Sequence, residues 1–333
     1  MEEKTFIIAE AGANHNRSFE TAVRLIDVAV DAGADAVKFQ TYSSETLYAK
    51  NSEDFADYKN INELIKSLEL PRQWQSELKR YCDDKGIEFM STPFDYEAVK
   101  ELVALGVKRM KISGFEATDP RFVRMVAETG LPLIISAGIG FTVKDLGVIR
   151  DITSEWNNEL TILHCNNAYP TPMEDINLFE VRKFKHMKGV DHTGLSDHTA
   201  STITPALAVA MGATVIEKHF TLSKSLDGPD HKFALEPDEL KEMVKNIRDA
   251  EKALTTKGNK SYTESEKNFT NAMRSVVTKI PLKRGDVLTE NNITTKRPCS
   301  EGSIKALNYF DMLGREVVTN VEADVALKWE WIN

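Results

Sequence analysis

The sequence has few cysteines, no long apolar run and no excess of basic residues. Its three cysteines, Cys82, Cys165 and Cys299, are odd in number and lack Cys-x-x-Cys spacing, so we expect reduced thiols in a cytoplasmic protein. No stretch approaches the roughly 18 apolar residues of a membrane span, and the apolar run at 6–9 is too short for a signal peptide. The net charge is −9, and the sequence has no stripe of basic residues that could bind the phosphates of a nucleic acid. We therefore expect neither a membrane nor a nucleic acid as partner.

What the 333 residues do contain is an alternation of short apolar strands with amphipathic helices. Ser18 can cap one such helix, and the last helix of the series follows Pro237. The pattern predicts eight strands, over 5–9, 36–40, 88–92, 109–112, 132–136, 161–165, 190–194 and 214–219. Eight β/α units in about 250 residues favour an α/β fold of the TIM-barrel type. A doubly wound open sheet is the alternative, but no Gly-rich nucleotide fingerprint follows the first strand.

One connection inside the alternating region is unusually long. It runs from 41 to 71 and contains Tyr42, Tyr48, Phe55 and Tyr58. Long loops in compact domains are often functional, so we weigh a lid over the site equally with a plain surface excursion.

The chain divides near residue 255, where the composition becomes polar. Residues 255–271 predict a linker, which separates a barrel over 1–254 from a small β-rich domain over 272–333. Within that domain, residues 282–293 echo residues 321–332, with apolar matches at the first, sixth, seventh and last positions. A pseudo-symmetric domain would produce such an echo, and so would chance.

Polar groups follow the predicted strands where each strand ends, which is where a TIM barrel places its chemistry. They are Glu10, Lys38, Gln40, Thr92, Lys111, Glu116, Ser136, His164, Asn166, Asn167, Ser196, Asp197, His198, Glu217 and His219. His198 and His219 end adjacent strands, so the pair predicts an open metal site with Lewis-acid chemistry. Lys38, Lys111 and Lys218 predict an anionic substrate beside it.

Several of these residues have a plainer structural interpretation. Lys38 and Lys111 could lie along the surface with their stems buried. Asp197 either orients a histidine or belongs to a turn. His186 and His192 are interpreted as structural, and Asp230 belongs first to a turn.

Taken together and in order, the motifs resemble those of the sialic acid synthase family, a family of phosphoenolpyruvate-dependent synthases of nine-carbon sugar acids. The matching segments are IAEAGANH (8–15), VKFQT (37–41), STPF (91–94), HC (164–165), YPTP (169–172), GLSDHT (194–199), EKHFT (217–221), GPD (228–230) and KRP (296–298). The resemblance covers nearly the whole chain. It implies a TIM barrel followed by a C-terminal antifreeze-like (SAF) domain.

The resemblance also implies roles for individual residues. His198 and His219 would hold a divalent metal, with Mn²⁺ favoured and Mg²⁺ or Co²⁺ as alternatives. The residues implied to bind phosphoenolpyruvate are Lys38, Thr92, Lys111, Ser136, Asn167 and Ser196. Those implied to bind an N-acetylated hexosamine are Glu10, Tyr169, Asp230 and Arg297, with Gln40 and His15 less defined. Glu10 is also the implied catalytic carboxylate, and Arg297 would come from the second subunit of a domain-swapped homodimer.

Two departures from the family pattern leave the acceptor sugar open. Gly114 stands at the usual serine position after the fourth strand, and Ser113 lies one place early. The segment 299–302 replaces a small Gly-rich turn. The products left open are N-acetylneuraminate, legionaminate and pseudaminate. The competing functions are another phosphoenolpyruvate-dependent aldol synthase, of the 3-deoxy-octulosonate phosphate type, and a noncatalytic sugar-binding protein.

Overall fold

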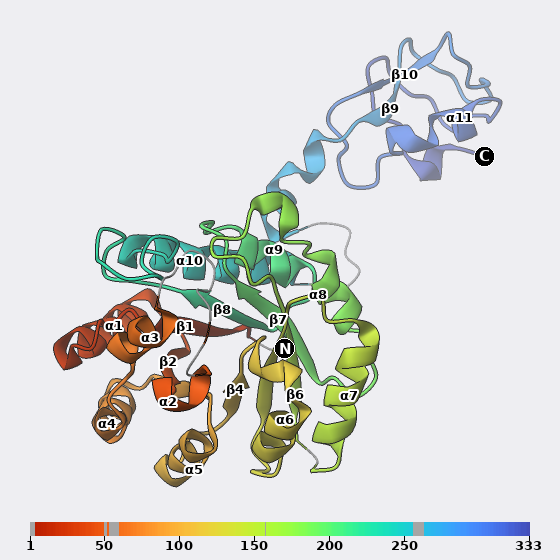
Figure 1. The fold of residues 1–333 in the computed structure, drawn as a ribbon. Helices are drawn as coiled ribbons and strands as arrows, with labels where there is room; N and C mark the ends of the chain where they lie inside the picture. Colours follow the sequence, from red (N-terminus) through yellow and green to blue (C-terminus); the bar gives the residue numbers. More distant parts are fainter. Residues whose placement is uncertain (1–3, 50–51, 53–59, 157, 256–262) are drawn as a thin grey trace. The chain divides into compact units, whose positions relative to one another are not determined.

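The computed structural model describes residues 4–49, 52, 60–156, 158–255 and 263–333 (Figure 1). The chain forms two compact units, Met1–Thr255 and Thr256–Asn333, which are described separately. Part of the predicted linker, 256–262, lies outside the described residues, and a 3₁₀ helix, η4 (Glu264–Ala272), follows it. No helix among the described residues has the length and apolarity needed to cross a bilayer.

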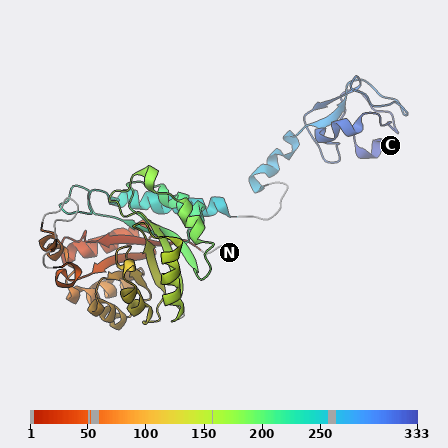
Figure 2. The same cartoon turned by 45° about the vertical axis from the view of Figure 1, so that its right-hand side comes forward.

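Eight parallel strands form the centre of the first unit (Figures 1 and 2). They are β1 (Phe6–Gly12), β2 (Ala36–Thr41), β3 (Glu88–Pro93), β4 (Met110–Ile112), β5 (Leu133–Ala137), β6 (Leu160–Cys165), β7 (His192–Asp197) and β8 (Val215–His219). Their order is β3-β2-β1-β8-β7-β6-β5-β4, and β3 also lies against β4. The predicted TIM barrel is confirmed. β1 and β7 run further than predicted, to Gly12 and Asp197.

Helices surround the barrel because each has one apolar face to bury. They are α1 (Phe19–Ala32), α4 (Gln75–Lys85), α5 (Tyr96–Leu105), α6 (Pro120–Ala127), α7 (Val143–Ser154), α8 (Phe179–Phe184), α9 (Thr204–Ala210) and α10 (Pro237–Leu254). The Ser18 hydroxyl accepts a hydrogen bond from the Thr21 amide at 3.2 Å, as predicted for an N-cap. Short 3₁₀ segments, η1 (Arg72–Trp74), η2 (Glu116–Thr118) and η3 (Met173–Asp175), begin or interrupt the connections.

The barrel interior changes character along its axis. A small apolar layer fills one end and consists of Ile8, Ala36, Met90, Ile134, Leu163 and Val215. Two residues further along the same strands stand Glu10, Lys38, Thr92, Ser136, Cys165 and Glu217. Because side chains alternate along a strand, positions two apart face the same side. The interior is therefore apolar at the start of the strands and polar at their carboxyl ends.

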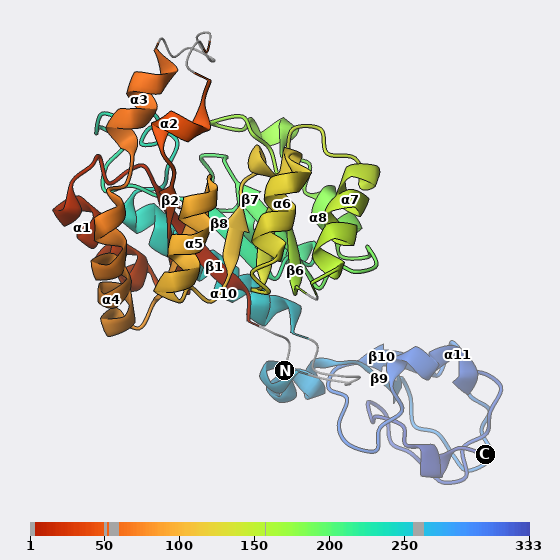
Figure 3. The same cartoon turned by 60° about the horizontal axis from the view of Figure 1, so that its bottom comes forward.

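The long connection after β2 folds back onto the barrel. It contains α2 (Ser44–Leu47) and α3 (Ile61–Leu68), which lie side by side in Figure 3. A separate apolar cluster of Ala13, Tyr42, Leu68 and neighbouring side chains packs there. Phe55 and Tyr58 of the predicted excursion lie outside the described residues, so the lid hypothesis stays untested.

The second unit is small and β-rich. It contains β9 (Ser275–Thr278), β10 (Ile293–Lys296), η5 (Ala306–Asn308), α11 (Tyr309–Met312) and η6 (Trp329–Trp331). The first residues of the two echoing segments, Leu282 and Val321, exchange backbone hydrogen bonds at 2.8 and 2.9 Å. Their fourth residues, Gly285 and Asp324, both have positive φ, and their seventh, Leu288 and Leu327, are both fully buried. The echo is therefore structural.

Candidate active site

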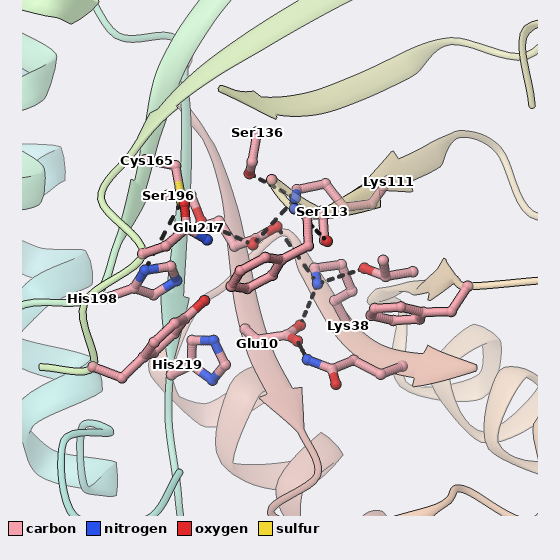
Figure 4. Close-up of a pocket in the computed structure, with 17 residues that line it drawn as sticks. Glu10, Lys38, Lys111, Ser113, Ser136, Cys165, Ser196, His198, Glu217 and His219 are labelled. Carbon is pink, nitrogen blue, oxygen red and sulfur yellow. Dashed lines mark hydrogen bonds and ion pairs between the residues drawn. The ribbon is translucent and has the colours of Figure 1, made fainter. Parts of the chain in front are cut away.

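Strand ends around the barrel converge on one pocket of about 50 Å³, called here the inner pocket (Figure 4). Its lining residues are Glu10, Lys38, Gln40, Thr92, Phe94, Lys111, Ser113, Gly114, Phe115, Ser136, Cys165, Asn167, Tyr169, Ser196, His198, Glu217 and His219. Every residue that the sequence assigned to phosphoenolpyruvate is in this set. The two lysines lie on one side of the pocket and the two histidines on the other (Figure 4).

Each buried lysine is paired with a hydroxyl group and shares a carboxylate. Lys38 Nζ lies 2.9 Å from Thr92 Oγ1 and 2.7 Å from Glu10 Oε2. Lys111 Nζ lies 2.8 Å from Ser136 Oγ. Glu217 stands between the lysines, 3.7 Å from each Nζ. Buried cations that carry hydroxyl groups beside them suit an anion with several oxygen atoms.

Burial and charge push the pKa values of the two carboxylates apart. Burial raises the pKa of Glu10 to about 7, against the lowering effect of Lys38. Burial also acts to raise the pKa of Glu217, but Lys111 and Lys38 outweigh it and the net shift is downward. When neighbouring carboxyl groups have different pKa values, one can carry a proton while the other stays ionised, and such pairs often have separate catalytic roles.

The two histidines are buried, neutral and close together. Their ring centroids are 5.4 Å apart. Burial lowers the pKa of His198 to about 4 and that of His219 well below its usual range. His198 Nδ1 lies 2.6 Å from the carbonyl oxygen of Asn166, which fixes Nδ1 as the donor and leaves Nε2 with a free lone pair.

These residues fit a divalent metal. Within the described part of the chain, His219 Nδ1 is buried without a hydrogen-bond partner, as expected of a ligand atom. The same part of the chain holds no cluster of three or more His, Cys, Asp or Glu side chains suited to a metal. A pair of imidazoles would leave other coordination positions for water and substrate oxygens.

A second, larger pocket of about 220 Å³ adjoins the first and is called here the outer pocket. The two share Gln40, Phe94, Ser113, Phe115, Tyr169 and His219. The Tyr169 ring lies 4.1 Å from that of His198 between centroids, and Asp230 Oδ2 lies 3.8 Å from His219 Nδ1. Gln40 donates to Glu10 Oε1 at 2.9 Å. The predicted sugar-binding residues of the barrel therefore gather at this junction.

Gly114 makes room for a neighbouring side chain. A Cβ atom there would lie 3.2 Å from Asn167 Oδ1, and one at Gly138 would lie 1.8 Å from the same atom. The hydroxyl of Ser113 donates to Glu116 and accepts from the Phe115 amide at 3.2 Å. Glycine at the usual serine position therefore leaves room for the side chain of Asn167. The hydroxyl of Ser113 caps a turn instead.

Lys218 does not face the pocket, so its prediction as a substrate contact is wrong. Its Nζ lies 2.7 Å from Asp197 Oδ2 and also donates to the Thr199 carbonyl. The reason is alternation along β8, which turns Glu217 and His219 inward and Lys218 outward. Asp197 accordingly pairs with Lys218 and Thr204, at 2.7 Å each, behind the histidines.

Two other predicted residues also lie elsewhere. His164 points away from the pocket, with Nε2 at 2.7 Å from the Ile176 carbonyl oxygen. His15 accepts from the Arg17 amide at 2.9 Å within a turn. Neither is among the lining residues of the inner or the outer pocket. Arg297 is exposed on the second unit, directly after β10.

Sequence reasoning gave no site role to Glu217 and Cys165, which both line the inner pocket. Glu217 was seen at a strand end but given no role, although its place two residues before His219 predicts the same facing. Cys165 was interpreted as a reduced thiol and as part of a family motif, without a role in the site. It is free and buried, its Sγ lies 3.8 Å from Asn167 Oδ1, and burial raises its pKa to about 11.

Known protein families match this chain over most of its length. The NeuB family matches residues 25–259, and the SAF domain matches residues 273–332. An N,N'-diacetyllegionaminic acid synthase of Campylobacter jejuni is 36% identical over 98% of this chain and 99% of its own. A pseudaminic acid synthase of the same species is 38% identical over 98% and 96%.

A solved structure carries the same fold. The N-acetylneuraminic acid (sialic acid) synthetase of Leptospira borgpetersenii, in complex with citrate, aligns with a TM-score of 0.73. It is 33% identical and covers 80% of this chain and 90% of its own. The chain belongs to the NeuB family, the family of sialic acid synthases.

Proposed function

We propose that this protein joins phosphoenolpyruvate to the aldehyde carbon of an N-acetylmannosamine-type sugar, giving a nine-carbon sugar acid and phosphate. The synthase names of its relatives support the reaction class. The observation that carries the proposal is the inner pocket, with two buried lysines facing two neutral histidines.

The lysine side of the pocket would hold phosphoenolpyruvate. Its carboxylate and phosphate need cations and hydroxyl donors, which Lys38 with Thr92 and Lys111 with Ser136 supply. Ser196, which donates to Glu217 Oε1 at 3.1 Å, and Asn167 complete the set. Side chains held in fixed positions would orient phosphoenolpyruvate for attack and so lower the entropy cost of the reaction.

The histidine side would hold the metal, Mn²⁺ by preference, between His198 and His219. When bound, a divalent cation supplies Lewis acidity at the oxygen of an aldehyde. His198 keeps its lone pair aimed inward because Asn166 holds its other ring nitrogen.

The reaction would then proceed in two bond-forming steps. C3 of phosphoenolpyruvate attacks the aldehyde carbon, and the aldehyde oxygen takes a proton. Water then attacks C2 and gives a proton to the carboxylate that supplied the first one, and phosphate leaves with cleavage of its C–O bond. Glu10 is the group placed to position the aldehyde or transfer the proton, since its pKa near 7 lets it hold one.

We extend the proposal to a domain-swapped homodimer in which Arg297 of the partner subunit reaches the acceptor. Support comes from the SAF match and from the exposure of Arg297 on its unit. Light scattering should give the mass of a dimer. In that dimer Arg297→Ala should raise the KM for the sugar and leave the KM for phosphoenolpyruvate unchanged.

Phosphate release tests the function directly. The protein is incubated with phosphoenolpyruvate, Mn²⁺ and either an N-acetylated hexosamine or a pentose phosphate, and the product mass is measured. Acceptor-dependent release with a product of the summed carbon count supports the proposal. Release only with a pentose phosphate would support the octulosonate-type alternative, and binding of sugar without release would support a binding protein.

A further inference from the structure

Two walls of the outer pocket come from long connections and are held in different ways. One belongs to the connection after β2, where Leu47, Ile65 and Leu68 pack together as apolar side chains. The other carries Asp230, from the connection between β8 and α10. Residues 220–236 of that second connection are all described, and they form turns, bends and a single bridge pair in place of a helix or strand. Side-chain contacts must therefore set the position of Asp230.

His231 supplies such contacts, because it is fully buried and both of its ring nitrogens have a partner. Nδ1 lies 2.6 Å from Thr221 Oγ1, and Nε2 lies 3.1 Å from Asn16 Oδ1. Asn16 Nδ2 donates to the Asp227 carbonyl at 2.9 Å, so Asn16 Oδ1 is left to accept from Nε2 of the ring. In a neutral ring Nδ1 then accepts from the Thr221 hydroxyl. The other acceptor near that hydroxyl, the Ser223 carbonyl oxygen, is further away at 3.2 Å.

The imidazole thereby connects three parts of the chain at the carboxyl ends of the strands. Asn16 belongs to the turn after β1, Thr221 lies two residues beyond β8, and His231 lies in the connection that leads to α10. The connection packs closely on the ring, since a Cβ atom at Gly228 would lie 2.7 Å from His231 Cδ2. Because β1 and β8 pair in the barrel, the ring fastens this connection to the barrel frame.

Holding the connection in place also holds the side chain of Asp230. Its Oδ2 lies 3.8 Å from His219 Nδ1, and a Cβ atom on Gly12 would lie 3.3 Å from the same oxygen. That Cβ atom would also lie 3.4 Å from Glu10 Oε1 and 3.5 Å from Gln40 Nε2. The side chains of Asp230, Glu10 and Gln40 therefore converge over a glycine at the junction of the inner and outer pockets.

We propose that His231 is a positioning residue for the acceptor sugar. Its two hydrogen bonds hold residues 227–231 so that Asp230 faces the junction of the pockets. This inference rests on the proposed function, in which Asp230 contacts the sugar. His231 lines neither pocket, so it acts on the reaction through Asp230. Loss of the ring should therefore weaken binding of the acceptor and leave binding of phosphoenolpyruvate unchanged.

Steady-state kinetics of His231→Ala at saturating Mn²⁺ test the proposal. The acceptor is N-acetylmannosamine or 2,4-diacetamido-2,4,6-trideoxymannose, whichever the parent turns over faster. We expect the KM for the sugar to rise by about 10–100-fold, the effect of losing one hydrogen bond to a charged group, and the KM for phosphoenolpyruvate to change by less than about twofold. His231→Gln, whose amide can still donate to Asn16, should recover part of the loss. An unchanged KM for the sugar, or an equal rise in both KM values, would overturn the inference.

A double variant separates positioning from a general loss of structure. If His231 acts through Asp230, adding His231→Ala to Asp230→Ala should raise the KM for the sugar by less than about threefold further, because the contact is already lost. Full additivity of the two changes would contradict the inference. His164→Ala is the matched control, since it removes a buried histidine that binds the Ile176 carbonyl outside both pockets. It should lower stability without raising the KM for the sugar.

A further variant and a crystal structure keep the test independent of folding and of the proposed function. If His231→Ala does not fold, Asn16→Gly replaces it, because glycine accepts the φ of 47° at this position while it removes the amide. If no acceptor supports phosphate release in the parent, the synthase proposal fails. Crystal structures of the parent and the variant then test the positioning role by itself. Displacement of Asp230 away from His219 in the variant would support it, and an unchanged Asp230 would overturn it.

Discussion

The inner and outer pockets adjoin but are built in different ways. The inner pocket takes its charged groups from strand ends, where Lys38, Lys111 and Glu217 are locked by the barrel. The outer pocket takes its apolar wall from two short helices in one long connection. The barrel frame thus holds the charged groups of the inner pocket, while a long connection lines the outer pocket, where the proposed acceptor would lie.

This contrast predicts unequal effects of substitution. A change in the inner pocket should affect every acceptor alike, because it acts on the reacting groups. A change in the outer pocket should alter the ranking of acceptors and leave chemistry in place. The first two predictions below test the first half of that contrast, and the last two measure how the buried charges in and behind the inner pocket affect stability. They run from the largest expected effect to the smallest.

His219→Ala should abolish turnover with every acceptor while the protein stays folded. It removes a buried ring nitrogen that has no hydrogen-bond partner in the described residues, so little hydrogen bonding is lost with it. We expect phosphate release to fall by at least about 10³-fold, the scale of a lost electrostatic stabiliser. His186→Ala, on an exposed position, is the control and should keep parent activity. Retained activity in His219→Ala would make the metal assignment wrong.

Lys111→Met should lower kcat/KM for phosphoenolpyruvate by about 10²-fold, near the cost of removing one charged hydrogen-bond donor from a dry site. Methionine keeps much of the side-chain volume but cannot donate to Ser136 or face Glu217. Steady-state kinetics with two acceptors measure the effect, which should be the same for both. An effect confined to one acceptor would break the division between the pockets.

Lys218→Met tests the support behind the histidines. It leaves Asp197 buried without its cation, which costs about 3–5 kcal/mol of unfolding free energy in comparable pairs. Lys245→Met is the control, because Lys245 pairs with Asp249 on the exposed face of α10, where such pairs are worth less than about 1 kcal/mol. Urea denaturation of both variants should show this difference. Equal losses would mean that the buried pair does not hold β7 and β8 together.

The sequence predicted the inner pocket better than the outer one, for a physical reason. Strand ends of a barrel must converge, so Lys38, Lys111 and Ser136 could be placed together from strand positions alone. Lys218 was wrongly predicted to face the substrate. Side chains alternate along a strand, so a His219 that faces the pocket requires Lys218 to face away from it. Leu47 and Ile65 could not be placed, since no periodic rule connects an excursion to the site it covers.

The smallest effect concerns Glu10 and the pH dependence of stability in the metal-free protein. Burial raises its pKa from 4.5 to about 7, so between these values the folded protein holds a proton that the unfolded chain has released. Stability therefore falls as pH rises through this window, by on the order of 1–3 kcal/mol. In Glu10→Gln that part of the slope should disappear, because glutamine does not titrate. Glu20→Gln, on an exposed position of α1, serves as control. Urea unfolding at pH 5 and pH 7.5 measures the slope, and an identical slope in Glu10→Gln and the parent would show that Lys38 keeps Glu10 ionised throughout.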